Sequence, residues 1–303
     1  MYLSHFGLTE LPFSITPDTS FFYGHSSCQD ALNTLLVSVR SGEGFIKVVG
    51  EVGTGKTLLC RKLLASLEDG YVTAYIPNPY VEPTTLLLAV ADELGVEYGR
   101  GADQHHLLKA LTAFLVDVHA HGRQVVLCLD EAQAMPIETL EALRLLSNLE
   151  TERRKLLQVV LFGQPELDIR LDDPSIRQLR QRISFSCSLA AMSVADVEYY
   201  VAHRLAIAGY RGPQLFSRQA VSALYRASRG IPRLINILAH KAMIAAFGEG
   251  ANLIGARYVQ EAIEDTESTR RRPIWQRIRA LRVAAMLGLM LVSAGLLLWR
   301  YRA

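Results

Sequence analysis

The chain is poor in the residues that usually build metal centres and disulfide frameworks. Its 303 residues include four cysteines, which are scattered through the sequence at positions 28, 60, 128 and 187. This spacing is typical of reduced, structural thiols rather than of a zinc site or a disulfide-stabilised secreted domain. Of the eight histidines, His105 and His106 are adjacent and His119 and His121 are two residues apart, so the histidines form no ligand set either.

The chain also lacks a large excess of charge and a secretion signal. Lysine and arginine number 32 against 30 acidic residues, so the net charge is only +2 and no broad basic surface requires DNA or RNA as the substrate. Residues 1–13 have neither the cationic start nor the long apolar region of a signal peptide. These absences favour a protein whose main body is cytoplasmic and does not act on nucleic acid.

One short motif carries more information than any other part of the chain. Residues 50–57 match every fixed position of the phosphate-binding pattern G-x-x-x-x-G-K-[ST]. The apolar run 45–49 before them predicts a buried strand, and residues 58–67 predict a helix, which is the context that this loop requires. The residues expected to hold the nucleotide phosphates are Gly50, Glu51, Val52, Gly53, Thr54, Gly55, Lys56, Thr57 and Leu58.

A second motif concerns hydrolysis. The apolar run 125–129 predicts a buried strand that ends in Asp130 and Glu131. We expect Lys56 to reach the β and γ phosphates of ATP, Thr57 and Asp130 to hold Mg²⁺, and Glu131 to orient the attacking water. The alternative is that the acidic pair caps a helix that begins near Pro136, a role compatible with the first.

Three further segments resemble parts of the AAA+ ATPases, whose active sites lie between neighbouring subunits of a ring. Gln164 follows the strand-like run 158–162, where these proteins carry a polar sensor of the γ-phosphate. Arg182, or as second choice Arg180, precedes the strand-like run 185–189 at the place of the arginine finger. Arg233, in the sequence Gly-Ile-Pro-Arg at 230–233, resembles the arginine of the sensor-2 motif, which contacts the γ-phosphate. A turn residue, a solvated basic helix face and an arginine beside a proline-initiated helix are the respective alternatives.

Five stretches of the sequence carry a further resemblance: residues 6–13, 16–23, 50–61, 130–133 and 163–167. Through them nearly the whole chain resembles the ExeA/GspA family of secretion and pilus-assembly ATPases, and within it the branch that serves MSHA-type pilus biogenesis. It implies a homo-oligomeric ring, possibly a hexamer, and an N-terminal aromatic segment packed over the nucleotide base. The candidates for that packing are Pro17, Phe21, Phe22 and Tyr23, although aromatic residues at this density also suit a core.

The order of apolar runs predicts an α/β fold with a separate helical lid. Strand-like runs near 45, 72, 125, 158 and 185 alternate with helical stretches at 84–94, 107–118 and 136–149, which indicates a parallel five-stranded sheet covered on both faces. From residue 193 onward the pattern is helical only. The expected divisions are an N-terminal segment at 1–44, an α/β nucleotide-binding domain at 45–191, a helical lid at 192–268, a basic linker at 269–282, a transmembrane helix at 283–299 and a tail at 300–303.

The expected membrane span rests on seventeen uncharged residues, 283–299, which end in Trp299. Six arginines lie between 270 and 282, whereas Arg300 and Arg302 follow the span, so the positive-inside rule places the ATPase domain in the cytoplasm. This predicts a single-pass protein of the bacterial inner membrane. A buried core helix is the alternative for the same residues.

These features together predict a membrane-anchored AAA+ ATPase that supports assembly of an MSHA-type (type IV) pilus or a type II secretion apparatus. Direct binding to peptidoglycan is not carried over, because the sequence stops at Ala303, before the region that serves this purpose in ExeA. Two other hypotheses remain open. One is a nucleotide-regulated DNA-binding ATPase of TniB type, and the other is an ATP-gated oligomeric scaffold with slow turnover.

Overall fold

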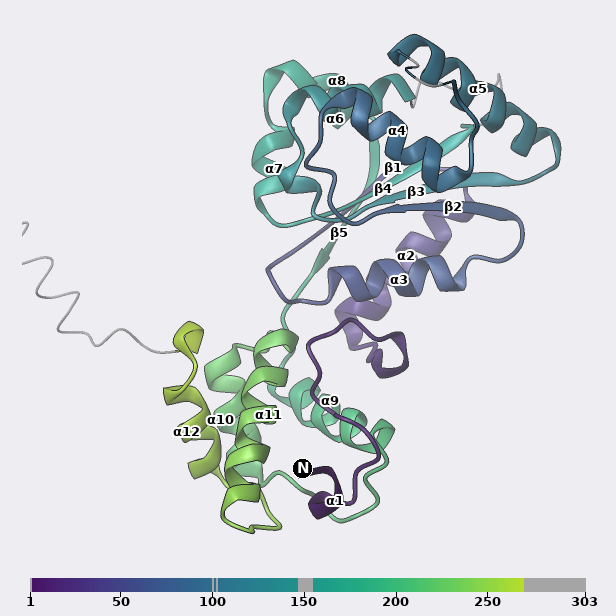
Figure 1. Cartoon of the computed structure of the whole chain (residues 1–303). Helices are drawn as coiled ribbons and strands as arrows, with labels where there is room; N and C mark the ends of the chain where they lie inside the picture. The colour runs from purple at the N-terminus through teal and green to yellow at the C-terminus, as the bar shows by residue number, and fades with distance from the viewer. Residues whose placement is uncertain (1, 100, 102, 147–154, 270–303) are drawn as a thin grey trace, which may run out of the picture.

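The computed structural model describes residues 2–99, 101, 103–146 and 155–269. These residues form an α/β body and a helical body that are joined by a narrow waist (Figure 1). The α/β body is built on five parallel strands, β1 (Phe45–Gly50), β2 (Tyr71–Ile76), β3 (Gln124–Leu129), β4 (Leu157–Gly163) and β5 (Ile183–Leu189), in the order β2-β3-β4-β1-β5. The predicted parallel five-stranded sheet is therefore confirmed.

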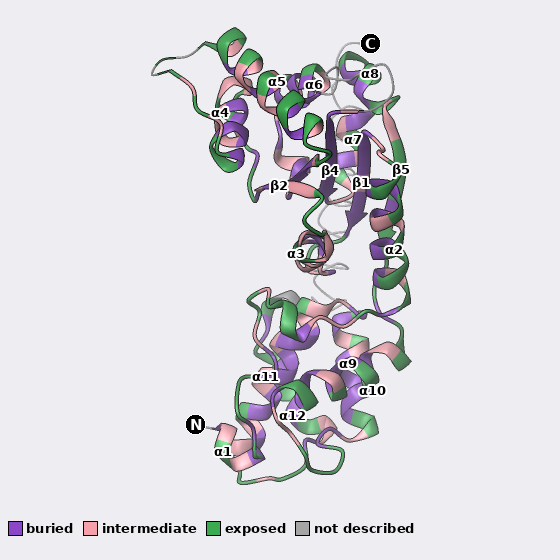
Figure 2. Cartoon of the chain, turned by 90° about the vertical axis from the view of Figure 1, so that its right-hand side faces the viewer, coloured by how far each residue is buried: buried purple, intermediate pink, exposed green. Residues whose placement is uncertain are grey.

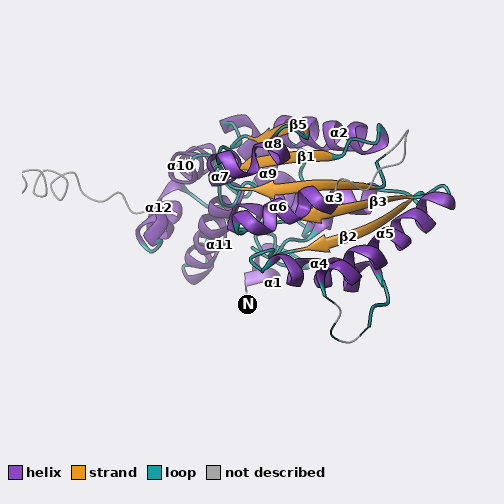
Figure 3. Cartoon of the chain, turned by 90° about the horizontal axis from the view of Figure 1, so that it is seen from above, coloured by secondary structure: helices purple, strands orange, loops and turns teal. Residues whose placement is uncertain are grey.

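Helices cover both faces of this sheet, as predicted (Figure 3). One face packs against α2 (Ser26–Arg40) and α3 (Lys56–Ser66), and the apolar contact includes Ile46 and Val48 of β1. The other face packs against α4 (Pro83–Leu94), α5 (Gln104–Ala120), α6 (Ile137–Leu146), α7 (Glu166–Leu171) and α8 (Arg177–Arg180). The central strands are buried on both sides (Figure 2), which explains why β3 and β4 are almost wholly apolar in sequence apart from Gln124 and Gln158.

The helical body consists of α9 (Val194–Ile207), α10 (Arg218–Ser228), α11 (Pro232–Gly248), α12 (Ala256–Glu264) and the 3₁₀ turn η4 (Glu267–Thr269). The start of the chain belongs to the same body. Buried apolar residues of the first 21 positions join the core of the helical body: Tyr2 and Phe6 of α1 (Tyr2–Phe6), Leu8, Phe13, and Phe21 of the 3₁₀ turn η1 (Thr19–Phe21). The expected segment 1–44 thus spans both bodies, because α2 packs on the sheet.

The chain crosses between the two bodies twice, and the crossings lie side by side. The hydroxyl of Ser27 donates to the Ser188 carbonyl at 3.3 Å and accepts from the Ala190 N–H at 3.0 Å. The neighbouring crossing is held against the helical body, since the Met192 N–H donates to the Gly230 carbonyl at 2.9 Å. A side chain at Gly230, where φ is +75°, would bring a Cβ within 2.0 Å of the Met192 carbonyl oxygen, so only glycine fits here.

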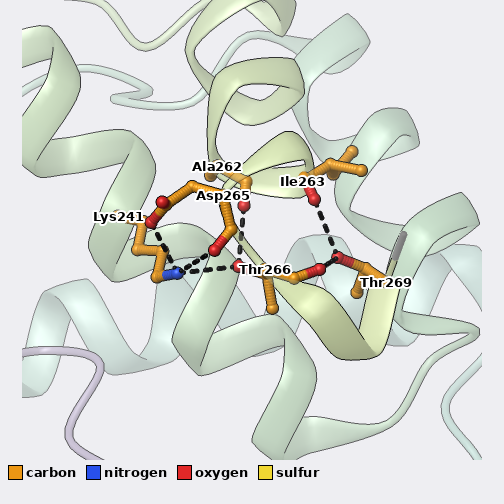
Figure 4. A network of polar contacts seen from close by, with 6 residues as sticks. All are labelled: Lys241, Ala262, Ile263, Asp265, Thr266 and Thr269. Atoms are coloured by element: carbon orange, nitrogen blue, oxygen red, sulfur yellow. Dashed lines mark hydrogen bonds and ion pairs between the residues drawn. The ribbon is translucent and has the colours of Figure 1, made fainter.

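The last described turn is tied to α11 by a polar network around Lys241 (Figure 4). The Lys241 ammonium donates to the Asp265 carboxylate at 2.8 Å, to the Asp265 carbonyl at 2.9 Å and to the Thr266 hydroxyl at 3.0 Å. Within the described ranges, no helix is both long and apolar enough to cross a membrane. The predicted span at 283–299, its tail at 300–303 and all but the first residue of the predicted linker at 269–282 lie outside the described residues.

Candidate nucleotide-binding site

The phosphate-binding motif forms a loop between the end of β1 at Gly50 and the start of α3 at Lys56. Gly53 has a φ of +83°, and a Cβ there would lie 2.7 Å from the Cβ of Arg233 in the helical body. Glycine is therefore required at this position both by the backbone conformation and by the close approach of the lid. The Thr54 hydroxyl donates to the Glu51 carbonyl at 2.9 Å, which closes the loop on itself.

Lys56 is 5% exposed and lies along the inside of the loop. Its ammonium donates to the carbonyls of Gly50 at 2.8 Å and Glu51 at 3.0 Å. Burial lowers the pKa of Lys56, while the nearby charges of Glu131 and Asp130 act in the opposite direction and favour the ammonium form. The two carbonyl oxygens carry only partial negative charge. A phosphate group bound at the loop would give the Lys56 ammonium a fully charged partner.

Thr57 and Asp130 come together from different elements. The Thr57 hydroxyl, in the first turn of α3, donates to the Asp130 carboxylate at 2.5 Å, and Asp130 follows β3 directly. Asp130 is 2% exposed, and burial raises its pKa, whereas the Thr57 hydrogen bond lowers it. A hydroxyl and a carboxylate oxygen are hard donors of the kind that Mg²⁺ takes from proteins alongside phosphate and water, so the pair fits the predicted magnesium ligands.

Glu131 is held by two glutamine side chains. Its Oε2 accepts from the Nε2 of Gln133 at 2.5 Å and from the Nε2 of Gln164 at 3.0 Å, and the Gln164 N–H donates to Gln133 Oε1 at 3.0 Å. The backbone of Glu131 is left-handed, with a φ of +52°, and the side chain makes no capping hydrogen bond to the following 3₁₀ turn η2 (Ala132–Ala134). The Glu131 side chain therefore does not cap this turn, and its expected part in hydrolysis stays a prediction.

Gln164 reaches Glu131 because β4 ends next to β3 at the same edge of the sheet. Its amide contacts the glutamate that is expected to orient water, and the predicted role of Gln164 as a sensor of the γ-phosphate stays a prediction. Gln133, which lies in the family-like stretch 130–133, is a partner of Glu131 that the sequence pattern did not predict. Its position two residues after Glu131, on a short turn, is the signal that could have suggested a partner for that carboxylate.

A cavity of about 310 Å³ lies between the phosphate-binding loop and the helical body. The loop side contributes Lys56, Thr57 and Glu131, and the helical body contributes Arg233 at the start of α11. The Arg233 N–H donates to the Gly53 carbonyl at 3.2 Å, so the lid touches the loop directly. The remaining lining residues are Val52, Gly53, Gly55 and Leu58 of the motif region, Ser14, Ile15, Thr16, Pro17 and Asp18 of the N-terminal segment, and Tyr200, Arg204, Pro232 and Asn236.

The four residues expected to pack over the base have different positions. Pro17 lines the cavity. Phe21 is buried in the core of the helical body, Tyr23 packs edge-on against Tyr200 at 5.8 Å between ring centroids, and the Lys62 ammonium lies 5.8 Å from the Phe22 ring. The core alternative therefore describes Phe21 and Tyr23.

The two candidate arginine fingers lie at the opposite edge of the sheet from the cavity, because they precede the amino end of β5. Arg180 pairs with Asp172 at 2.6 Å, and Arg182 donates to the Arg144 carbonyl at 3.4 Å. Neither residue lines the cavity of its own chain. A role for either one in hydrolysis therefore requires a second copy of the protein.

Known proteins resemble this chain in sequence and in fold. Residues 39–171 match the family model described as AAA domain. General secretion pathway protein A of Aeromonas hydrophila is 40% identical over 301 residues, which is 99% of this chain and 54% of that protein. The predicted resemblance to the ExeA/GspA family of AAA+ ATPases is therefore confirmed. The chain spans about half the length of this curated relative.

Solved structures show the same fold at low sequence identity. Cdc6p of Pyrobaculum aerophilum has a TM-score of 0.64 and 19% identity over 82% of this chain and 70% of that protein. The ORC2 protein of Aeropyrum pernix has a TM-score of 0.61 and 17% identity over 85% and 73% of the two chains. The RuvB branch migration motor of Thermotoga maritima follows with 0.55 and 15% over 87% and 76%. At these identities the likeness shows the fold alone.

Proposed function

We propose that the protein binds ATP with Mg²⁺ and hydrolyses it. The observation that carries this proposal is the arrangement of Glu131, which two glutamine amides hold at the same sheet edge as the phosphate-binding loop and the Thr57–Asp130 pair. Phosphoryl transfer needs positioned groups and neutralised charge more than covalent catalysis. All the groups that the reaction requires from one subunit therefore line or border one cavity.

Each residue has a separate task in this proposal. Lys56 exchanges its two carbonyl contacts for the β and γ phosphates, and Thr57 with Asp130 would hold Mg²⁺, which neutralises phosphate charge when bound. Glu131 orients the attacking water and accepts its proton, because the Oε2 atom is fixed by Gln133 and Gln164. Arg233 approaches the γ-phosphate from the lid, and Arg182 or Arg180 of a neighbouring copy completes the site.

We place this activity in the assembly of an envelope machine. The support is the name of the 40% identical relative, a general secretion pathway protein, together with the sequence resemblance to the MSHA-type pilus branch. The basic residues at 270–282 and the uncharged run at 283–299 support a single-pass anchor in the inner membrane with the ATPase in the cytoplasm. The proposed partners are further copies of the chain in a ring and secretion or pilus assembly proteins.

Steady-state ATP turnover and ATP binding in two variants test the enzymatic proposal. Glu131→Gln should still bind ATP but should lose turnover by roughly 100-fold or more, the range typical of a lost general base. Lys56→Ala should lose ATP binding as well. Glu138→Gln on the exposed side of α6 is the matched control and should behave as the unchanged protein.

The outcomes separate the alternatives. Undiminished ATP affinity in Lys56→Ala would overturn the site assignment. Normal pilus or secretion assembly with Glu131→Gln would favour an ATP-gated scaffold whose turnover is dispensable. Turnover that appears only with added DNA would favour the DNA-binding ATPase of TniB type.

A further inference from the structure

Arg204 of α9 is a buried cation that no carboxylate pairs with in the described part of the chain. It is 5% exposed, and among residues 2–99, 101, 103–146 and 155–269 no salt bridge involves it. Its guanidinium instead lies 4.6 Å from the centroid of the Phe21 ring and 5.6 Å from that of Tyr200. A buried charge is costly unless its donors are satisfied, so this position must be explained by what the guanidinium holds.

The guanidinium holds the N-terminal segment. Its Nε donates to the Pro12 carbonyl, its Nη2 to the Ser14 carbonyl at 3.4 Å, and its Nη1 to the Tyr200 hydroxyl at 3.0 Å. A planar fork of donors fixes the direction of several acceptors at once, which a lysine or an apolar side chain cannot do. Arg204 therefore holds the backbone just before and at the first residue of the stretch 14–18, which lines the cavity.

A second helix of the lid reinforces this grip. The amide of Asn236 in α11 donates to the Ser14 carbonyl at 3.1 Å and accepts from the Tyr200 hydroxyl at 2.8 Å. At the far end of the segment, hydrogen bonds from Ser20 hold the pKa of the Asp18 carboxyl below its usual value, and the charge of Arg204 adds a smaller effect in the same direction. From the α/β body, Arg61 of α3 donates to the Pro17 carbonyl at 2.7 Å.

The cavity is lined by two sets of residues with different chemistry. Lys56, Thr57 and Glu131 come from the α/β body and include the predicted phosphate contacts, whereas residues 14–18 with Tyr200, Arg204 and Asn236 come from the helical body. A triphosphate seated on the loop leaves the lining from the helical body to the ribose and base.

We propose that Arg204 is a positioning residue that fixes residues 14–18 as the lid-borne wall for the nucleoside part of ATP. This inference rests on the proposed nucleotide function and adds a specific role within it. Side chains of α9 and α11 hold the start of this wall at Ser14, and Arg61 of α3 holds it at Pro17. Affinity for ATP therefore depends on Arg204, whereas affinity for a phosphate chain without a nucleoside does not.

The test compares two ligands, MgATP and magnesium tripolyphosphate, by calorimetry on the full chain. Arg204→Gln removes the charged fork, and the loss of its hydrogen bonds should weaken MgATP binding about tenfold. Tripolyphosphate binding should change less than about twofold. Arg204→Lys keeps the charge without the fork and should show the same selective loss. Arg218→Gln, an exposed lid arginine outside the cavity, should leave both affinities unchanged.

Each outcome decides the question. An equal loss for both ligands means that Arg204 serves only the fold, and an unchanged MgATP affinity means that it does not position the wall; either result overturns the proposal. If the Arg204 variants fail to fold, Tyr200→Phe, which removes the hydroxyl between Arg204 and Asn236, is tested in the same way. The loss of MgATP affinity is then compared with the loss of tripolyphosphate affinity. If the unchanged protein binds MgATP no more tightly than magnesium tripolyphosphate, residues 14–18 have no role in binding the nucleoside. If it binds neither ligand, the nucleotide function itself is refuted.

Discussion

At the scale of single residues, the two carboxylates of the site stand in positions that cost the folded state free energy. Asp130 is almost completely buried, and Glu131 adopts a left-handed backbone at a φ of +52°, a conformation that costs a non-glycine residue about 1 kcal/mol or more. Neither feature improves packing. Both are understandable if the position of the carboxylate oxygens, rather than the stability of the fold, determines which residues stand there.

Asp130→Asn should therefore stabilise the ligand-free protein while it abolishes Mg²⁺-dependent turnover. Burial raises the pKa of Asp130, so the ionised carboxylate at neutral pH destabilises the folded state, and the neutral amide should gain roughly 1 kcal/mol. The gain should shrink as the pH falls toward the ordinary pKa of an aspartate, because the original side chain then becomes neutral as well. Thermal unfolding without ligand, measured between pH 7 and pH 4, checks both signs. A variant that is less stable at every pH would show that the charge is satisfied in the ligand-free state.

At the scale of elements, the sequence pattern predicted the strands and the phosphate-binding loop, because residues within each segment determine these structures. The strands β1, β3 and β4 are short apolar runs bounded by polar residues, and the phosphate-binding loop combines required glycines with a required lysine and threonine. The first residue of β5 is Ile183 rather than Phe185, because the pairing with β1 is irregular at that end. Boundaries of this kind depend on partners that the run itself does not contain.

Contacts between distant parts of the chain could not be predicted in this way. The Tyr2 hydroxyl bonds to His240 at 2.8 Å and the Thr9 N–H to the Ala208 carbonyl at 2.8 Å, so the first helix belongs to a body whose other members begin at residue 194. The clamp on Glu131 is similar, since Gln164 comes from another strand. No periodicity within either segment specifies such a partner.

The packing of the N-terminal segment leads to a prediction for Phe13. This side chain is 2% exposed and lies edge-on to Phe216, with 5.8 Å between the ring centroids. Phe13→Ala should destabilise the helical body by about 3 to 5 kcal/mol, as is usual for a truncated core phenylalanine. Hydrogen exchange should then rise in α9–α12 while the central strands of the sheet keep their protection. Val37→Ala, on the exposed face of α2, is the control for a substitution outside that core and should change neither region.

At the scale of the whole molecule, the cavity lies where two bodies meet. The sheet supplies the phosphate loop and the carboxylates, and the helical body supplies Arg233 and the wall at residues 14–18. The crossings at residues 22–25 and 190–192 lie next to each other, joined by Ser27 and Ala190. Because the two connecting segments are adjacent, the two bodies can rotate relative to each other about that connection more readily than either segment can shift alone. Nucleotide bound in the cavity would therefore bias how the two bodies are oriented, which is how a chemical step could be transmitted to a partner.

If Arg182 or Arg180 takes part in hydrolysis, it must do so from a second copy of the chain. Arg182 and Arg180 precede the amino end of β5, whereas Lys56 and Glu131 lie at the carboxyl edge of the sheet. Lys56→Ala and Arg182→Ala should each be inactive alone, but a mixture should recover part of the turnover, because an interface can pair an intact loop from one copy with an intact arginine from the other. Specific activity of the unchanged protein should also rise with concentration. Arg177→Ala, which removes an exposed arginine at the start of α8, should remain active in the same assay. If the mixture stays inactive although each variant still assembles with the unchanged protein, the arginine does not act between subunits, and the groups that β1, β3 and β4 bring together within one chain must suffice for hydrolysis.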